Sequence, residues 1–146
     1  MIRATLDTNV LAPGIITSPQ TVNGQVIQAW RDNKYSLVLS EVILTELSRT
    51  LSQPYFSARL TAAQIEAILN LIRSEATVVP LLIPVAGVAP HPEDDLILAT
   101  ALSGKAHYLV TRDEKLQEKV QEYKGVVIVS PPVFLQRLRE DTKKAA

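Results

Sequence analysis

Cysteine is absent from this chain of 146 residues, which excludes disulfides, thiolate metal sites and cysteine nucleophiles and is compatible with a reducing compartment. Aromatic residues are also scarce, at 5% of the sequence, which is little for a platform that stacks nucleobases. No charge of either sign is in excess, because 15 basic and 15 acidic residues give a formal net charge of +0. A protein that holds nucleic acid by charge alone is therefore disfavoured, and the composition favours catalysis over passive binding.

Long apolar runs are missing as well. No stretch reaches the roughly 18 consecutive apolar residues of a membrane span, and the first residues lack the apolar region that follows the basic start of a signal peptide. We therefore expect a cytoplasmic protein that does not enter a membrane. The hydrophobic fraction of 47% suits one globular domain with a substantial core. We predict that domain over residues 1–140 and a frayed polar tail over residues 141–146.

What the chain does contain is an alternation of short β-rich runs with segments of helical period. Strands are predicted over residues 2–6, 35–39, 77–79, 107–111 and 126–129. Helix signals lie between them: Ser40 is a typical N-cap, Thr61 with Gln64 forms a capping-box pattern, and Gly104 stands where a helix would end. This alternation predicts an α/β fold with a mostly parallel sheet and right-handed crossovers that place helices on both faces.

Four acidic residues stand at or near the predicted carboxyl ends of the strands, where ligand sites gather in such sheets. Asp7 directly follows the first strand, and Asp113 lies just beyond the fourth. Glu46 belongs to the helix after the second strand, beside its apolar stripe. Asp94 lies in the first turn of a very apolar helix, where a bare carboxylate is costly. We therefore expect these four side chains to meet at one edge of the sheet.

Carboxylates that share one crevice repel each other unless a cation joins them. Mg²⁺ and Mn²⁺ prefer carboxylate oxygens and water, and either ion can polarise a phosphoryl oxygen and activate water. The pattern is therefore typical of phosphodiester hydrolysis. Each acid taken singly also has a purely structural interpretation, because acids are common at helix N-termini and in turns. It is the coincidence of all four at one edge that favours a site.

Four segments of the sequence, taken together, resemble the motifs of the PIN-domain family. They occur in the family's order as LDTNVL at 6–11, SEVILTEL at 40–47, DDLILATA at 94–101 and YLVTRD at 108–113. The resemblance implies a three-layer α/β/α sandwich around a mostly parallel sheet of about five strands. It also implies a ribonuclease that cleaves single-stranded RNA with one or two Mg²⁺ or Mn²⁺ ions. By motif position, Asp7, Glu46, Asp94 and Asp113 would bind the metal and carry the catalysis.

Further expectations follow from the same resemblance. Asn9 and Thr111 match polar positions that support the metal ligands. Many small members are VapC-like toxins of toxin–antitoxin pairs, so the resemblance implies a homodimer and a cognate antitoxin protein as partners besides RNA.

The sequence also departs from the family pattern. Some relatives carry further acids where His91 and Lys115 stand here, and Asp95 and Glu114 are the available substitutes. The choice between Asp94 and Asp95 as the principal ligand rests on counting back from residues 99–101, and both remain open. We therefore keep Asp95 as a supporting residue.

Other features of the sequence allow more than one interpretation. Arg112, next to Asp113, and Arg49 are candidate contacts for substrate phosphates. The turn at residues 53–56, QPYF, has aromatic side chains suited either to a partner surface or to a local plug. The neutral charge leaves open an alternative function, a catalytically weak or inactive module of the same fold that binds RNA or a protein. A phosphatase with an acid two residues after Asp7 is disfavoured, because Asn9 occupies that position.

Overall fold

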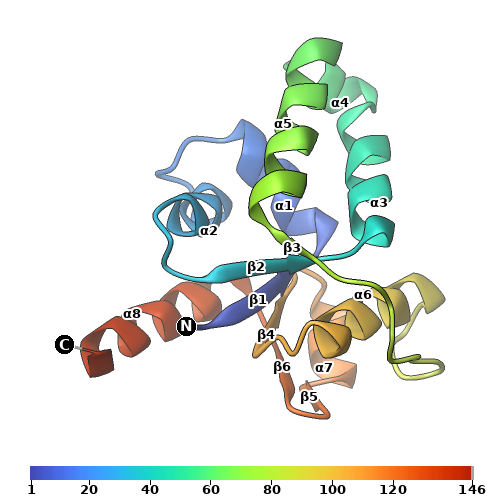
Figure 1. The fold of residues 1–146 in the computed structure, drawn as a ribbon, viewed down its shortest axis with the longest axis vertical. Helices are drawn as coiled ribbons and strands as arrows, with labels where there is room; N and C mark the ends of the chain where they lie inside the picture. The colour runs from blue at the N-terminus through green and yellow to red at the C-terminus, as the bar shows by residue number, and fades with distance from the viewer. Residues whose placement is uncertain (146) are drawn as a thin grey trace.

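A central six-stranded sheet organises the computed structural model, which describes residues 1–145. The strands lie in the order β3-β2-β1-β4-β6-β5 (Figure 1). Their bounds are β1 (Arg3–Leu6), β2 (Ser36–Leu39), β3 (Thr77–Val78), β4 (Tyr108–Val110), β5 (Glu122–Tyr123) and β6 (Val126–Val129). All neighbours are parallel except β5, which pairs antiparallel with β6. The mostly parallel α/β architecture is confirmed, and the two-residue β5 is the strand that sequence periodicity missed.

Helices cover both sides of this sheet. They are α1 (Thr8–Ile16), α2 (Val22–Arg31), α3 (Glu41–Leu51), α4 (Pro54–Ser57), α5 (Ala62–Glu75), α6 (Pro92–Ser103), α7 (Glu114–Lys119) and α8 (Pro131–Ala145). In Figure 1, α1, α2, α3 and α5 lie above the sheet, and α6 and α7 lie below it. The predicted polar tail falls in α8, which continues to Ala145, while the last predicted tail residue, 146, lies outside the described residues. Within residues 1–145, none of the helices has both the length and the apolar character to span a bilayer.

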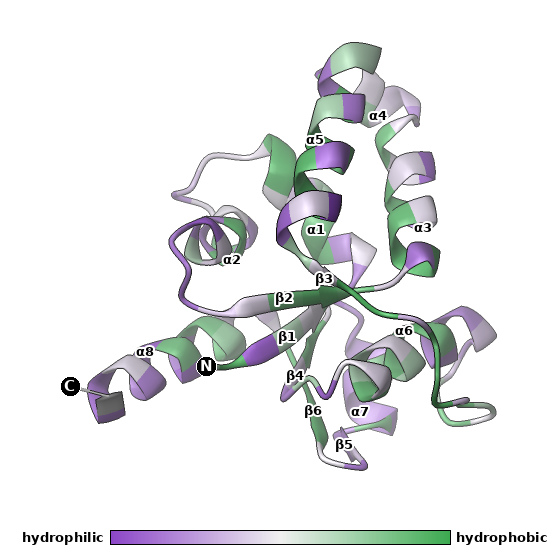
Figure 2. Ribbon diagram, viewed as in Figure 1, coloured by the Kyte–Doolittle hydropathy of each residue, from purple (hydrophilic) through white to green (hydrophobic). Residues whose placement is uncertain are grey.

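The core lies on both faces of the sheet. Apolar residues of the strands are buried, since Ala4 and Leu6 of β1 and Leu39 of β2 have no exposed surface, as expected for parallel strands covered by helices. Much of β2, β4 and β6 is green in Figure 2, whereas part of β1 is purple. Aromatic packing holds helix α8 against the core, where the rings of Tyr35 and Phe134 meet edge to face with centroids 4.9 Å apart. This core fixes the strand ends from which the site is built.

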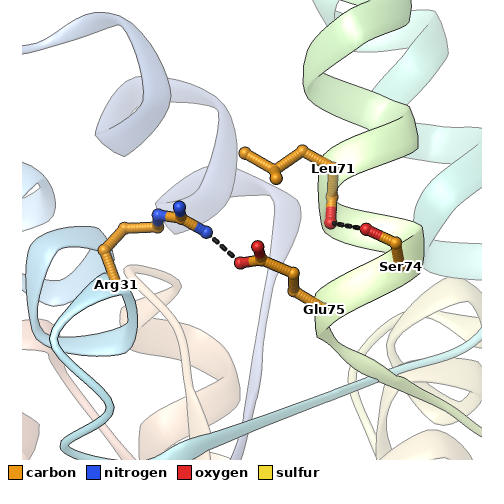
Figure 3. A network of polar contacts seen from close by, with 4 residues as sticks. All are labelled: Arg31, Leu71, Ser74 and Glu75. Atoms are coloured by element: carbon orange, nitrogen blue, oxygen red, sulfur yellow. Dashed lines mark hydrogen bonds and ion pairs between the residues drawn. The ribbon is translucent and has the colours of Figure 1, made fainter.

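Helices α3 and α5 form an arm that rises from the sheet, with the short α4 at its far end (Figure 1). The predicted capping box is present at the start of α5, where the Thr61 hydroxyl accepts from the Gln64 backbone and the Gln64 side chain accepts from the Thr61 backbone. Arg31 of α2 and Glu75 of α5 form an ion pair beside this arm (Figure 3). Both side chains are partly exposed, so the pair contributes little stability. Its main effect is to join α2 to the end of α5.

The predicted helix boundaries at Ser40 and Gly104 are also seen, with one difference. Ser40 occupies the N-cap position of α3, yet its hydroxyl makes no capping bond. Instead it lies 2.8 Å from the Thr100 hydroxyl of α6. Gly104 is the C-cap of α6, and a Cβ there would lie 2.2 Å from Val38 of β2. Both contacts fix α6 closely against β2 and α3.

Candidate active site

The strand order places a topological switch point between β1 and β4. The chain runs from β1 through β2 to β3 on one side, and β4 is followed by β6 on the other side of β1. In open α/β sheets, ligands bind outside the carboxyl ends of the strands at such a point. Asp7 follows β1 there, and residues 111–113 follow β4. The site therefore lies at the carboxyl edge of the sheet between β1 and β4. The connections that leave these two strands run in opposite directions, so they leave this edge uncovered.

Thr111 connects the two strand ends through its hydroxyl. This hydroxyl donates to Asp7 Oδ2 at 2.8 Å and accepts from the Asp113 backbone N–H at 3.1 Å. It also accepts from the Asn9 side-chain amide at 3.3 Å, whose oxygen accepts from the Arg112 backbone N–H at 3.1 Å. Thr111 is completely buried and Asp7 is 6% exposed. The two residues expected to support the acids, Asn9 and Thr111, thus fix the orientation of Asp7.

At this edge lies a pocket of about 370 Å³. We call it the acid pocket. The four acids predicted to share a site all line it, and they come from four separate segments: Asp7, Glu46, Asp94 and Asp113. The other lining residues are Thr8, Asn9, Ala12, Pro13, Thr50, Phe56 and Arg112. The volume falls within the usual range of small-molecule sites.

The acid pocket adjoins two other depressions, with which it shares lining residues. A wider groove between α3 and the first turn of α6 shares Glu46, Asp94 and Asp113 with it and extends to Arg49. Arg112 lines both the acid pocket and a smaller depression near the start of α8. The acids are therefore bordered by two further depressions, one lined by Arg49 and the other by Arg112.

Burial and mutual repulsion destabilise negative charge in this pocket. The pKa of Asp94 is raised from 3.8 to about 6, first by burial and then by the charges of Asp7 and Asp113. Burial also raises the pKa of Asp7, although hydrogen bonds from Thr111 and the local backbone oppose the shift. The pKa of Glu46 is raised by burial and by Asp7. The negative charge of three of the four acids is thus destabilised, and a nearby cation would relieve this.

The residues present fit a hard divalent cation with an open coordination shell. Asp94 Oδ2 is buried without a hydrogen-bond partner, and so is the Thr8 hydroxyl oxygen, which leaves oxygens in the pocket free to coordinate. In the part of the chain that the structure describes, no three acidic or histidine side chains converge tightly enough to hold a metal ion by themselves. Mg²⁺ suits such an arrangement, because it keeps several waters and needs only one or two carboxylates.

Asp95 points away from the acid pocket. Its carboxylate accepts hydrogen bonds from the backbone N–H groups of Gly87, Val88 and Ala89, at 3.0, 3.2 and 2.8 Å. It is 6% exposed and lies in the first turn of α6, from which it binds the loop that precedes the helix. Of the two neighbouring acids that sequence left open, Asp94 therefore lines the pocket, and Asp95 holds the loop that positions α6.

Five lining residues were not expected from the sequence: Thr8, Ala12, Pro13, Thr50 and Phe56. Ala12 and Pro13 lie beyond Asp7 along α1, and Thr50 lies one turn beyond Glu46 along α3. Pro13 is four residues from Asn9, and Thr50 is four residues from Glu46. These spacings could have indicated both residues, because residues four apart share a helix face. Phe56 of α4 had no such signal, because its place depends on how the chain turns after α3.

The fold and the pocket define an α/β protein with an acidic cleft at the switch point of a parallel sheet. The sequence profile of the PIN domain matches residues 3–115, and the chain belongs to the PIN domain family. The match includes all four pocket acids and ends within α7, before β5, β6 and α8.

Solved structures share the fold at low sequence identity. VapBC2 from Rickettsia felis, bound to a DNA fragment from its promoter, matches with a TM-score of 0.57 and 15% identity over 88% of this chain and 98% of the other. FitAcB from Neisseria gonorrhoeae matches with a TM-score of 0.54 and 16% identity over 88% and 97%. PAE2754 from Pyrobaculum aerophilum gives 0.52 and 16% over 95% and 98%. No curated protein sequence matches this chain significantly.

Proposed function

We propose that this protein is a metal-dependent endoribonuclease that hydrolyses phosphodiester bonds of single-stranded RNA. The observation that carries the proposal is the gathering of Asp7, Glu46, Asp94 and Asp113 from four segments in one pocket, with Asp94 Oδ2 buried and unpaired. One or two Mg²⁺ or Mn²⁺ ions held by these acids would polarise the phosphate and activate water. Membership of the PIN domain family supports this assignment.

The chain's own residues position the reaction. The Thr111 hydroxyl donates to one oxygen of Asp7 and so orients this carboxylate, which lines the pocket. Asp113 caps α7 with one oxygen, which accepts from the Lys115 and Leu116 backbone N–H groups. One of the pocket carboxylates accepts the proton of the attacking water. The two adjoining depressions would give an RNA strand room beyond the acids, which suits cleavage within a strand.

Two arginines are suited to hold the phosphates on either side of the reacting bond. Arg112 lines the acid pocket and Arg49 lines the adjoining groove. Arginine is well matched to phosphate oxygens through its planar set of donors. We assign both residues to the binding of the substrate backbone rather than to the chemical step.

Partners follow from the resemblance to VapC-like proteins. We propose that the chain is the toxin of a toxin–antitoxin pair, acts in the cytoplasm, forms a homodimer and is inhibited by a cognate antitoxin protein. The structural likeness to VapBC2 and FitAcB supports this proposed assignment. Co-expression with the protein encoded beside it is the direct test of this assignment.

The nuclease proposal is tested by cleavage of a mixed single-stranded RNA pool with Mn²⁺, Mg²⁺ or EDTA. We expect metal-dependent cleavage by the parent and a loss of at least about 100-fold in Asp7→Asn, because that variant removes a negative ligand without changing its shape. Asp141→Asn in α8 is the matched control, since it makes the same chemical change away from the acid pocket. A folded Asp7→Asn protein that cleaves like the parent would refute the assignment.

A non-catalytic module is the alternative, and one observation favours it. Among residues 1–145, no three acidic or histidine side chains already form a cluster that could hold a metal. Titration with Mn²⁺, followed by calorimetry, separates the two functions. Binding that disappears in Asp7→Asn supports the nuclease, whereas a folded parent that neither binds Mn²⁺ nor cleaves RNA is the module.

A further inference from the structure

Phe56 is the one aromatic side chain among the described residues that line the acid pocket. It belongs to the four-residue helix α4 and is half-buried, since part of its ring packs against the core. Tyr55 packs against it edge to face, with ring centroids 5.1 Å apart and an interplanar angle of 80°. Arg59 in turn covers the Tyr55 ring, 3.9 Å from its centroid. The Phe56 ring is therefore held in place while part of it stays open to the pocket.

The acid pocket is polar at the sheet and apolar farther out. Asp7, Asp94 and Asp113 lie near the strand ends, whereas Ala12 and Pro13 lie farther along α1. In Figure 1, α1 and α3 rise from the sheet, and α4 stands at the far end of α3. The outer part of the pocket thus has an aromatic ring on α4 and apolar side chains on α1.

This division matches the two halves of a nucleotide. One helical turn, about 6 Å, separates Glu46 from Thr50 along α3, and Phe56 lies beyond Thr50. A nucleotide whose phosphate lies at the acids can extend its base over a similar distance into the outer pocket. Flat apolar walls suit the faces of a base, because base–aromatic stacking needs no particular base identity.

We propose that Phe56 forms a nucleobase subsite, on which the base of the nucleotide adjoining the scissile phosphate stacks. The subsite rests on the proposed function, because it uses the phosphate position at the four acids. It requires a base that is free of its neighbours, so it selects single-stranded RNA over a duplex. It also gives a role to the aromatic turn at residues 53–56, which forms part of the substrate pocket.

The test is cleavage of a short oligoribonucleotide in which one nucleotide at a time, around the mapped cut, is replaced by an abasic residue. In the parent, we expect kcat/KM to fall by about 5- to 150-fold at one flanking position. In Phe56→Ala, the intact substrate should be cleaved more slowly by a similar factor, and the abasic replacement should cost almost nothing further. Loss of the base and loss of the ring would then be non-additive.

Two further variants separate stacking from folding. Phe56→Leu keeps most of the apolar volume and should fold like the parent, yet lose most of the dependence on the base. Tyr55→Ala is the matched control, because it removes a neighbouring ring that does not line the acid pocket, and it should keep a substantial part of the abasic penalty.

The outcomes distinguish the subsite from the nuclease assignment. If the parent cleaves and Asp7→Asn does not, but the abasic penalty is the same in the parent and in folded Phe56→Leu, the subsite is wrong and the nuclease stands. If the folded parent cleaves no RNA with either metal, both proposals fall.

Discussion

The raised pKa of Asp94 makes the folded protein less stable when this carboxyl group is ionised. Its pKa rises from 3.8 to about 6 because of burial and of the nearby Asp7 and Asp113 charges. The folded state therefore holds this proton more tightly than the unfolded chain. The resulting stabilisation is fully present below about pH 4 and is lost as the pH rises through about 6. Burial shifts the pKa of Asp7 and Glu46 in the same direction.

We accordingly predict that the metal-free protein is less stable at about pH 7 than at about pH 5, and that Asp94→Asn reduces this loss. The amide has nearly the shape of the carboxylic acid but carries no charge at either pH. Urea denaturation in EDTA at both pH values measures the effect. Asp141→Asn is the control, since it lies outside the acid pocket and should behave like the parent. Equal pH dependence in parent and Asp94→Asn would contradict the shifted pKa.

At the scale of elements, the start of α6 depends on the loop before it. The connection from β3 to α6 carries exposed apolar side chains, including Leu82 at 73% exposure, and Figure 2 draws it largely in green. Asp95 holds the end of this connection by accepting three backbone hydrogen bonds. Because Asp94 is its neighbour, the same bonds determine where Asp94 enters the pocket.

Asp95→Ala should therefore destabilise the protein by about 2–4 kcal/mol, because three N–H groups lose a charged acceptor. Asp95→Asn retains one acceptor oxygen and should cost less. Urea denaturation measures both, and cleavage assays at low temperature show whether the folded variants keep metal-dependent activity, as we expect. An Asp95→Ala protein of normal stability and no activity would instead make Asp95 the metal ligand that the sequence left open.

The residues of the acid pocket also show what could and could not be predicted from the sequence. The alternation of strands and helices in the sequence predicted where the strands end, so Asp7 and Asp113 could be placed at the carboxyl edge of the sheet. The choice between Asp94 and Asp95 needed the rotation of α6, which tertiary contacts such as Ser40 with Thr100 determine. The position of Phe56 in the pocket could not be predicted from the sequence. Residues 54–57 form a single short helix, whose position depends on the path of the chain between α3 and α5.

At the scale of the whole molecule, neutrality conceals an uneven distribution of charge. The formal net charge is +0, yet four acids line one pocket, which Arg112 also lines, while Arg49 lines the adjoining groove. The ion pairs found among residues 1–145 join Arg31 to Glu75 and Arg73 to Glu41. Arg49 and Arg112 are therefore available to phosphates, so the affinity for RNA depends on a few cations instead of a basic surface.

We predict that Arg112→Ala lowers the salt dependence of binding to single-stranded RNA. Each phosphate contact contributes about 0.7 to the slope of log K against log salt, so the loss of one contact should reduce the slope by roughly that amount. The measurement is fluorescence anisotropy with Mg²⁺ in an Asp7→Asn background, where the strand stays intact. Arg112→Lys should keep the slope because it keeps the charge. Arg137→Ala in α8, outside the acid pocket, should also leave the slope unchanged; an equal decrease in both alanine variants would mean that RNA follows diffuse surface charge and not the path across the acids.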